Sequence, residues 1–188
     1  MRIGHAKSIP ALLPDGWVRV EQVRKTSTRL EVGFAVHIAG RGGSKTGAWS
    51  VICQGVRETH LTDFNGGGLA VYPASHPAAR QYTAQRAVLR WLANFASPAI
   101  LGALYQAHSD AVDDWIPFDR YVDIESGKCV CRGPDFLMRA YAKALRAQGE
   151  RPLVTPLGTK KSKSAKLGVL HFGESFVVAA KFTAERVL

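Results

Sequence analysis

Residues 30–38 read LEVGFAVHI and alternate from end to end between large apolar side chains and small or polar ones. The large apolar members fall at every second position: Leu30, Val32, Phe34, Val36 and Ile38. Successive side chains of a β-strand point to opposite faces, so this pattern predicts a strand with one buried face. The composition agrees, because β-branched and aromatic residues fit a half-buried pleated surface.

Further strands are expected on both sides of this stretch. Residues 17–24 form a partner strand, joined to it through residues 25–28, and residues 48–56 form a third strand. Residues 57–64 form a fourth strand or continue the third, and residues 69–72 form a short one after the turn Asn-Gly-Gly-Gly at 65–68. The first part of the chain therefore predicts an antiparallel meander of four or five strands.

The middle of the chain has helical spacing. After Pro77, a first helix is predicted from the apolar positions Ala84, Val88, Trp91, Leu92 and Phe95. A second helix is predicted to begin at Ser97-Pro98, with its buried side formed by Ile100, Leu101, Leu104, Tyr105 and His108. A third is predicted from Pro134 to a stop at Gly149, with inward side chains Leu137, Tyr141, Ala144 and Leu145.

The end of the chain returns to strands. Residues 153–157 are expected to be extended, and residues 167–172 and 175–182 to form a hairpin around Gly173-Glu174, a pair suited to a type II′ turn. This order predicts an α+β fold, with an antiparallel sheet (N-terminal meander plus C-terminal hairpin) packed against two to three helices. The 188 residues fit a single domain, with a possible subdivision near residues 73–77.

Several classes of protein do not fit the sequence. No apolar run has the roughly 18–20 residues needed to span a bilayer. The apolar segment in the opening residues is too short and too interrupted for a signal peptide. The three cysteines, Cys53, Cys129 and Cys131, leave an odd thiol, which favours a reducing, cytoplasmic compartment. Neither a dinucleotide-binding motif nor a phosphate-binding P-loop occurs, so no cofactor is expected.

The charges are distributed unevenly. Residues 110–125, the acidic stretch, hold six of the fifteen acidic residues and one basic residue, Arg120, although the whole chain has a net charge of +10. The rest of the chain is therefore strongly basic, which favours a polyanionic partner, although basic surfaces also serve solubility. The first hypothesis is a non-enzymatic module that binds DNA, RNA or another polyanion. Its candidate contacts are Arg24, Lys25, Arg29, Arg41, Lys45, Arg86, Arg90, Lys160, Lys161, Lys163 and Lys166.

A second hypothesis is a protein-interaction surface on the acidic stretch. Aromatic rings inside an acidic segment are typical either of a protein contact or of a loop inserted into the core. The candidate contacts are Asp113, Asp114, Trp115, Phe118 and Asp119. Carboxylates can also bind Mg²⁺, but their spacing matches no metal motif, and no metal site is expected.

A third hypothesis is a small hydrolase or transferase. His60, Asp63 and His76 lie near one predicted turn, and a histidine can serve as general acid or base near neutral pH. Regular strand alternation places His60 and Asp63 on opposite faces, so their convergence would need a bulge. The sequence leaves open whether the protein is an enzyme and what its oligomeric state is.

Overall fold

The structure is a computed structural model, and it describes residues 2–3, 16–38, 45–62, 65–91, 97–122, 130–158 and 166–187. The chain divides into two compact units. Unit one comprises Met1–Ala79 and Ala165–Leu188, and unit two comprises Arg80–Ser164. Unit two is thus inserted in sequence between two parts of unit one. The prediction of a single domain with a subdivision near residues 73–77 stays a prediction.

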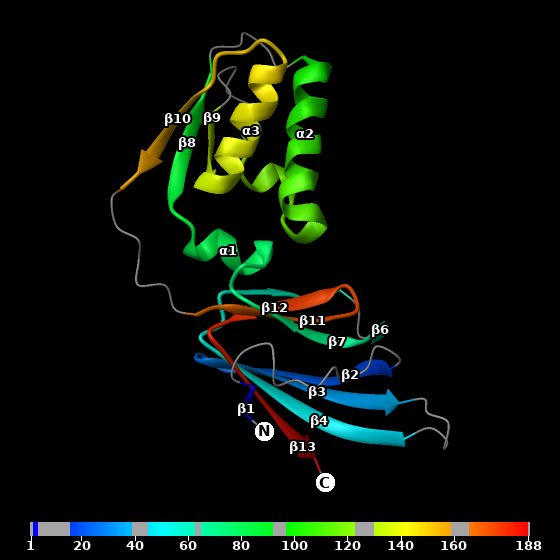
Figure 1. Cartoon of the computed structure of the whole chain (residues 1–188). Helices are drawn as coiled ribbons and strands as arrows, with labels where there is room; N and C mark the ends of the chain where they lie inside the picture. Colours follow the sequence, from blue (N-terminus) through cyan, green and yellow to red (C-terminus); the bar gives the residue numbers. More distant parts are fainter. Residues whose placement is uncertain are drawn as a thin grey trace. The chain divides into compact units, whose positions relative to one another are not determined.

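Unit one contains two antiparallel sheets (Figure 1). The first has six strands in the order β1 (Arg2–Ile3), β13 (Lys181–Val187), β4 (Lys45–Gln54), β3 (Arg29–Ile38), β2 (Gly16–Lys25) and β6 (Asn65–Gly67). The second has four strands in the order β5 (Glu58–His60), β12 (Ser175–Ala179), β11 (Gly168–Phe172) and β7 (Leu69–Tyr72). The predicted N-terminal meander is confirmed for the three consecutive strands β2, β3 and β4. Its expected fourth and fifth strands, β5 and β7, belong instead to the second sheet, where they pair with β12 and β11.

The core of unit one lies between these sheets. The large apolar residues of β3, from Leu30 to Val36, are buried at every second position, as their alternation predicts. They share one hydrophobic cluster with residues of the second sheet, including Leu170, Phe172 and Val177. Phe34 meets Phe172 edge to face, with ring centroids 5.0 Å apart.

Two strands bend from one sheet into the other at the same point. The chain passes from β4 to β5 through Gly55, and from β12 to β13 through Ala180. Backbone hydrogen bonds join these two crossings, from the Ala180 amide to the Gln54 carbonyl (3.0 Å) and from the Arg57 amide to the Val178 carbonyl (2.8 Å). Gly55 has a φ of +64°, a conformation that glycine adopts without cost. We call this place the corner.

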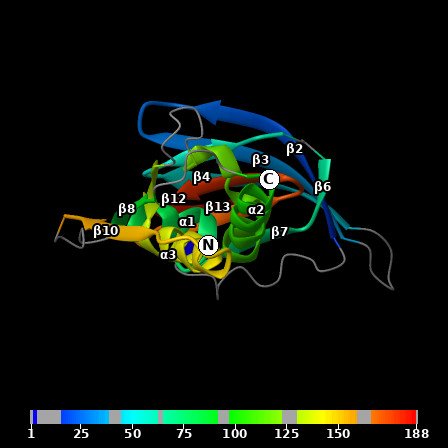
Figure 2. The ribbon, with the colours of Figure 1, turned by 90° about the horizontal axis from the view of Figure 1, so that it is seen from above.

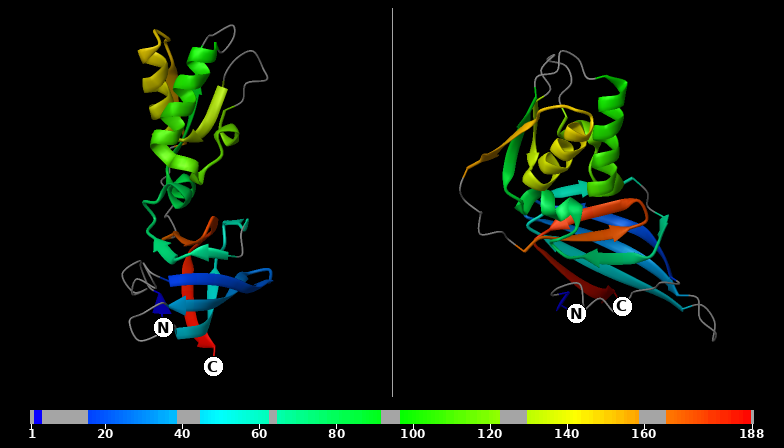
Figure 3. Two further views of the ribbon diagram at one scale, coloured as in Figure 1. Left: turned by 90° about the vertical axis from the view of Figure 1, so that its right-hand side faces the viewer. Right: turned by 45° about the horizontal axis from the view of Figure 1, so that its top comes forward.

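Unit two contains a three-stranded antiparallel sheet in the order β10 (Leu153–Leu157), β8 (Arg86–Arg90) and β9 (Val130–Pro134). Two helices, α2 (Pro98–Val112) and α3 (Asp135–Ala147), lie side by side (Figures 1 and 3). Both pack on one face of the sheet, where Leu89 of β8 shares a hydrophobic cluster with Leu104 of α2 and Leu137 of α3. Two single-turn 3₁₀ helices, Asp113–Trp115 and Phe118–Arg120, follow α2.

The predicted first helix is wrong over most of its length. The helix α1 covers only Pro77–Thr83, and residues 86–90 form the central strand of the sheet in unit two. Val88, expected on the core-facing stripe of that helix, instead lies in this strand between Ala87 and Leu89, which are the residues that join the core of unit two. The run Ala-Val-Leu is too short for its apolar period to distinguish a strand from a helix, and β-sheet pairing on both sides decided the outcome.

The ends of the other helices are confirmed. The Ser97 hydroxyl accepts a hydrogen bond from the Ile100 amide at 3.3 Å, which satisfies one of the free donors at the start of α2. Gly149 follows α3 with a φ of +83°. One assignment on α2 is wrong, because Tyr105 is 57% exposed.

The predicted α+β class is therefore confirmed, with antiparallel sheets and three α-helices among the described residues. The predicted C-terminal hairpin is also present, as β11 and β12 paired around Gly173, whose φ is +57°. No helix in the described part of the chain is long and apolar enough to cross a bilayer.

Candidate functional site

The outer face of the sheet in unit two carries cationic side chains. Alternation along β8 directs Ala87 and Leu89 into the core, where both are fully buried. Arg86, Val88 and Arg90 therefore point away from the helices. Both arginines are exposed.

The neighbouring strands extend this face. In β9, Arg132 pairs directly with Val88 and lies on the same face, where it is exposed. In β10, the partners of Arg90, Val88 and Arg86 are Leu153, Thr155 and Leu157. We call these seven residues the arginine face. Its edge strand β10, drawn in orange, lies beyond α3 as seen from α2 (Figure 2).

The arginine face combines charge with apolar surface. Leu153 is 62% exposed and Leu157 is 45% exposed, so both present apolar surface to solvent on this edge strand. Val88, in the centre of the face, is only 4% exposed. The face thus presents apolar patches on one strand beside cationic heads on the other two.

The three arginines are not neutralised within the described parts of the chain. Arg86, Arg90 and Arg132 form no ion pair or side-chain hydrogen bond with any described residue. Other arginines do form ion pairs: Arg19 with Glu21, Arg29 with Glu31, and Arg139 with Asp135. Strand geometry puts the Cα atoms of Arg86 and Arg90 about 13 Å apart and that of Arg132 roughly 8 Å from each.

The structure places the other predicted cationic contacts elsewhere. Arg24, Lys25 and Arg29 lie at the end of the β2–β3 hairpin in unit one. Lys45 begins β4, and Lys166 is exposed just before β11. The residues outside the described ranges are Arg41, Lys160, Lys161 and Lys163.

Of the predicted cations, the structure thus brings Arg86 and Arg90 onto one face and adds Arg132, which the sequence analysis missed. Arg132 follows the small buried residue Cys131 and precedes Gly133 in a short alternating segment. That alternation was the available signal, but it becomes readable only once β8 is known to be a strand.

The candidate catalytic residues are not assembled into one site. His60 lies on β5 and His76 follows β7, and these are the two edge strands of the four-stranded sheet. The ring of His60 stacks on Phe176 at a centroid distance of 5.3 Å. Asp63 lies outside the described residues.

His76 belongs instead to a cluster with Tyr72 and His171. Its ring stacks on Tyr72 at 4.6 Å, and the ring of His171 lies 5.8 Å from Tyr72. Burial, followed by the charge of His171, lowers the pKa of His76. Burial also lowers the pKa of His171, against the opposing effect of a backbone hydrogen bond at Gly173. Both rings are therefore held in their neutral form more strongly than in the unfolded chain.

The aromatic residues of the acidic stretch pack against the core of unit two. Trp115 and Phe118 are partly buried against its hydrophobic cluster, whereas Asp113 and Asp119 are exposed. Asp114 lies in the first 3₁₀ turn, but its side chain is outside the described set. This arrangement agrees with the interpretation of the stretch as a loop inserted into the core.

The buried ring of His108 makes two hydrogen bonds, one of them to this loop. Its Nδ1 lies 2.6 Å from the Tyr141 hydroxyl, and its Nε2 lies 2.6 Å from the Ile116 carbonyl. A carbonyl can only accept, so Nε2 carries the proton and Nδ1 accepts a hydrogen bond from Tyr141. Ile116, Tyr121 and Val122 of the same loop are buried. His108, predicted on the buried side of its helix, thus has a structural role.

The thiols do not form a reactive centre in the described parts of the chain. Burial raises the pKa of the Cys53 thiol to about 12, which disfavours the nucleophilic thiolate. Cys131 is also buried. Among the described residues, no three His, Cys, Asp or Glu side chains lie close enough together to hold a metal ion.

No protein-family model, curated protein sequence or solved structure matches this chain.

Proposed function

We propose that the protein binds nucleic acid, without catalysis, through the arginine face of unit two. The supporting observation is that Arg86, Arg90 and Arg132 project from adjacent strands onto one exposed face and pair with no described carboxylate. Unneutralised cations at such spacing suit a chain of phosphates, each contact releasing a condensed counterion.

The chemistry of this face favours nucleic acid over an acidic protein. An arginine guanidinium is planar, forms paired hydrogen bonds with phosphate oxygens, and stacks on bases. The exposed side chains of Leu153 and Leu157 provide apolar surface for sugars and base faces, and the Thr155 hydroxyl lies between them. Since phosphate contacts carry no sequence information, we expect weak sequence preference.

The test is fluorescence anisotropy with labelled single-stranded and duplex oligonucleotides at salt concentrations from about 50 to 200 mM. The affected variant carries Arg86→Gln, Arg90→Gln and Arg132→Gln together. We expect it to reduce the slope of log K against log salt by about 2 to 3 units, at about 0.7 to 0.9 per lost phosphate contact.

A matched control variant carries Arg139→Gln, Lys143→Gln and Arg146→Gln. These three exposed residues lie on α3, which covers the opposite face of the same sheet, and the net charge changes equally. The control should retain most of the slope. The proposal fails if the wild type binds no oligonucleotide, if both variants lose affinity equally, or if polyglutamate competes as strongly as nucleic acid.

A further inference from the structure

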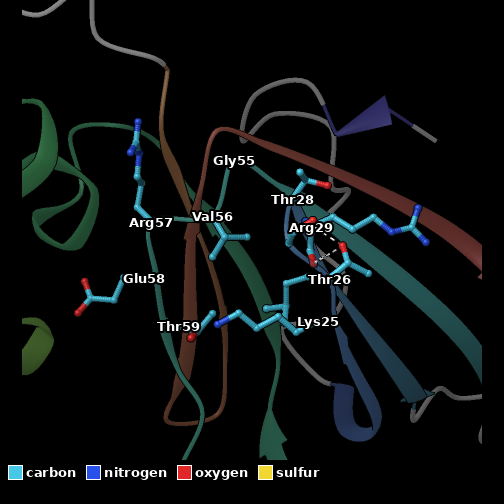
Figure 4. A pocket seen from close by; sticks show the side chains of 11 residues that line it. Lys25, Thr26, Thr28, Arg29, Gly55, Val56, Arg57, Glu58 and Thr59 are labelled. Carbon is cyan, nitrogen blue, oxygen red and sulfur yellow. Dashed lines mark hydrogen bonds between the residues drawn. The ribbon is translucent and has the colours of Figure 1, made fainter.

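A pocket lies at the end of the β2–β3 hairpin in unit one. Its volume is about 490 Å³, within the range of small-molecule sites. The turn 26–28 and the segment 55–59 after the corner form its walls (Figure 4). Leu30 and Val56, which belong to the core or pack against it, line its apolar part. The pocket is therefore the accessible end of the core between the two sheets.

Lys25 occupies an unusual position at this pocket. The inward-facing residues of β2 are Val18 and Val20, then Val23 after an irregularity in the register, and Lys25. Lys25 pairs with Leu30, a core residue, so the row of valines ends in an exposed cation directed toward the interior. An inward lysine at a strand end also discourages sheet aggregation, but here it borders a pocket.

A hydroxyl group faces Lys25 from the second sheet. Thr59 pairs with the core residue Val177 and therefore points inward from β5. In Figure 4 the Lys25 side chain extends toward Thr59, while the guanidinium groups of Arg29 and Arg57 point away from it. Lys25 and Thr59 thus supply an ammonium and a hydroxyl donor to the same pocket.

The turn adds further donors. The Thr26 hydroxyl is occupied by the backbone of Arg29, with which it makes two contacts of 3.3 Å. Ser27 and Thr28 are exposed, and their hydroxyls make no hydrogen bond with any described residue. The charges lining the pocket are three cations against one carboxylate, that of Glu58. Because Arg29 is paired to Glu31 and the Arg57 guanidinium points away, Lys25 supplies the positive charge at the pocket.

We propose that this pocket binds a small phosphate monoester. Lys25 and Thr59 bind the phosphate group, and Leu30 and Val56 contact the organic part. A dianion with three acceptor oxygens can accept from both an ammonium and a hydroxyl, and it gains more from the ammonium than a monoanionic carboxylate does. This site is built entirely from unit one and is independent of the arginine face.

Calorimetry and amide chemical-shift titrations test the proposal on the full chain. The probes are adenosine 5′-monophosphate, adenosine and inorganic phosphate. We expect saturable binding of the monophosphate, with shifted amides in residues 25–30 and 55–59. Lys25→Gln should weaken it by about ten-fold or more, since a charge-assisted hydrogen bond is lost. Thr59→Val, a milder change, should weaken binding several-fold.

Arg24→Gln is the matched control. Arg24 is adjacent to Lys25 and exposed. It lies opposite Glu31 in the strand register, so it is on the other face of the sheet, and it does not line the pocket. Its removal changes the net charge equally and should alter the affinity less than about two-fold. Three results would each overturn the proposal. The first is an equal loss of affinity in both variants, and the second is binding of adenosine or inorganic phosphate as tight as that of the monophosphate. The third is an absence of shifted amides at about 10 mM ligand. None of these results depends on the nucleic-acid site.

Discussion

Replacing Gly55 with alanine should destabilise unit one, because its backbone is left-handed and an added Cβ atom would crowd Ala180. Gly55 has a φ of +64°, and a left-handed conformation costs an L-residue about 1–2 kcal/mol. A Cβ atom at this position would lie 3.0 Å from the Cβ of Ala180 on the other bent strand. Ala180 is exposed and can shift, so this contact adds at most about 1 kcal/mol. Gly55→Ala should therefore lower the free energy of unfolding by about 1–3 kcal/mol.

The measurement is urea denaturation, with amide hydrogen exchange in β3 and β4 as a readout specific to unit one. Gly102→Ala is the control, because Gly102 is exposed in α2 and a Cβ there meets nothing within 4 Å. The control should stabilise its helix by about 0.5–1 kcal/mol.

The double variant Gly55→Ala with Ala180→Gly separates the two costs. It removes the contact between the methyl groups but leaves the backbone conformation unfavourable, so it should recover only part of the loss. The reasoning is refuted if Gly55→Ala changes the stability of unit one by less than about 0.5 kcal/mol, the usual range of a neutral surface substitution. An absence of coupling between the two positions would contradict the steric part alone.

Two further predictions concern buried polar groups. Tyr141→Phe should destabilise unit two by about 1–3 kcal/mol, because it leaves Nδ1 of the buried His108 without its 2.6 Å hydrogen bond. Urea denaturation measures the change, and an unchanged stability would contradict the assigned geometry. The pKa values of His76 and His171 are lowered in the folded state. As the pH falls below about 6.5, these histidines therefore take up protons in the unfolded state before they do so in the folded state. The stability of unit one should consequently decrease as the pH falls from about 7 to 5. The double variant His76→Asn with His171→Asn should flatten this part of the stability profile, and an identical pH dependence in the variant would show that other groups are responsible.

Local pattern was sufficient for those elements whose periodicity is long or whose ends carry specific residues. The nine-residue alternation from Leu30 identified β3, and Ser97 and Gly149 marked the start of α2 and the end of α3. The segment at Arg86 was misread because only three apolar residues, Ala87 to Leu89, lie between its two arginines, too few to show a period. Only the pairing of β8 with β9 and β10 distinguishes it, and such pairing is not a local property of the sequence.

The candidate sites were predictable to the same limited degree. Charge composition indicated a basic contact surface and selected Arg86 and Arg90, but Arg132 joins them only through the strand register. The significance of Lys25 likewise depends on its inward direction, which is set by an irregularity between Val20 and Gln22 that the sequence does not reveal.

The discontinuous composition of unit one has a consequence for biosynthesis. Its β4 strand pairs with β13, so that Gln54 is matched with Lys181, and the core between its sheets needs residues from both parts of the chain. A ribosome delivers the whole inserted segment before β11, β12 and β13 emerge. The early strands must therefore wait, with one face uncovered, until β11, β12 and β13 have been translated. Chaperone engagement and aggregation of nascent chains should concentrate in that interval.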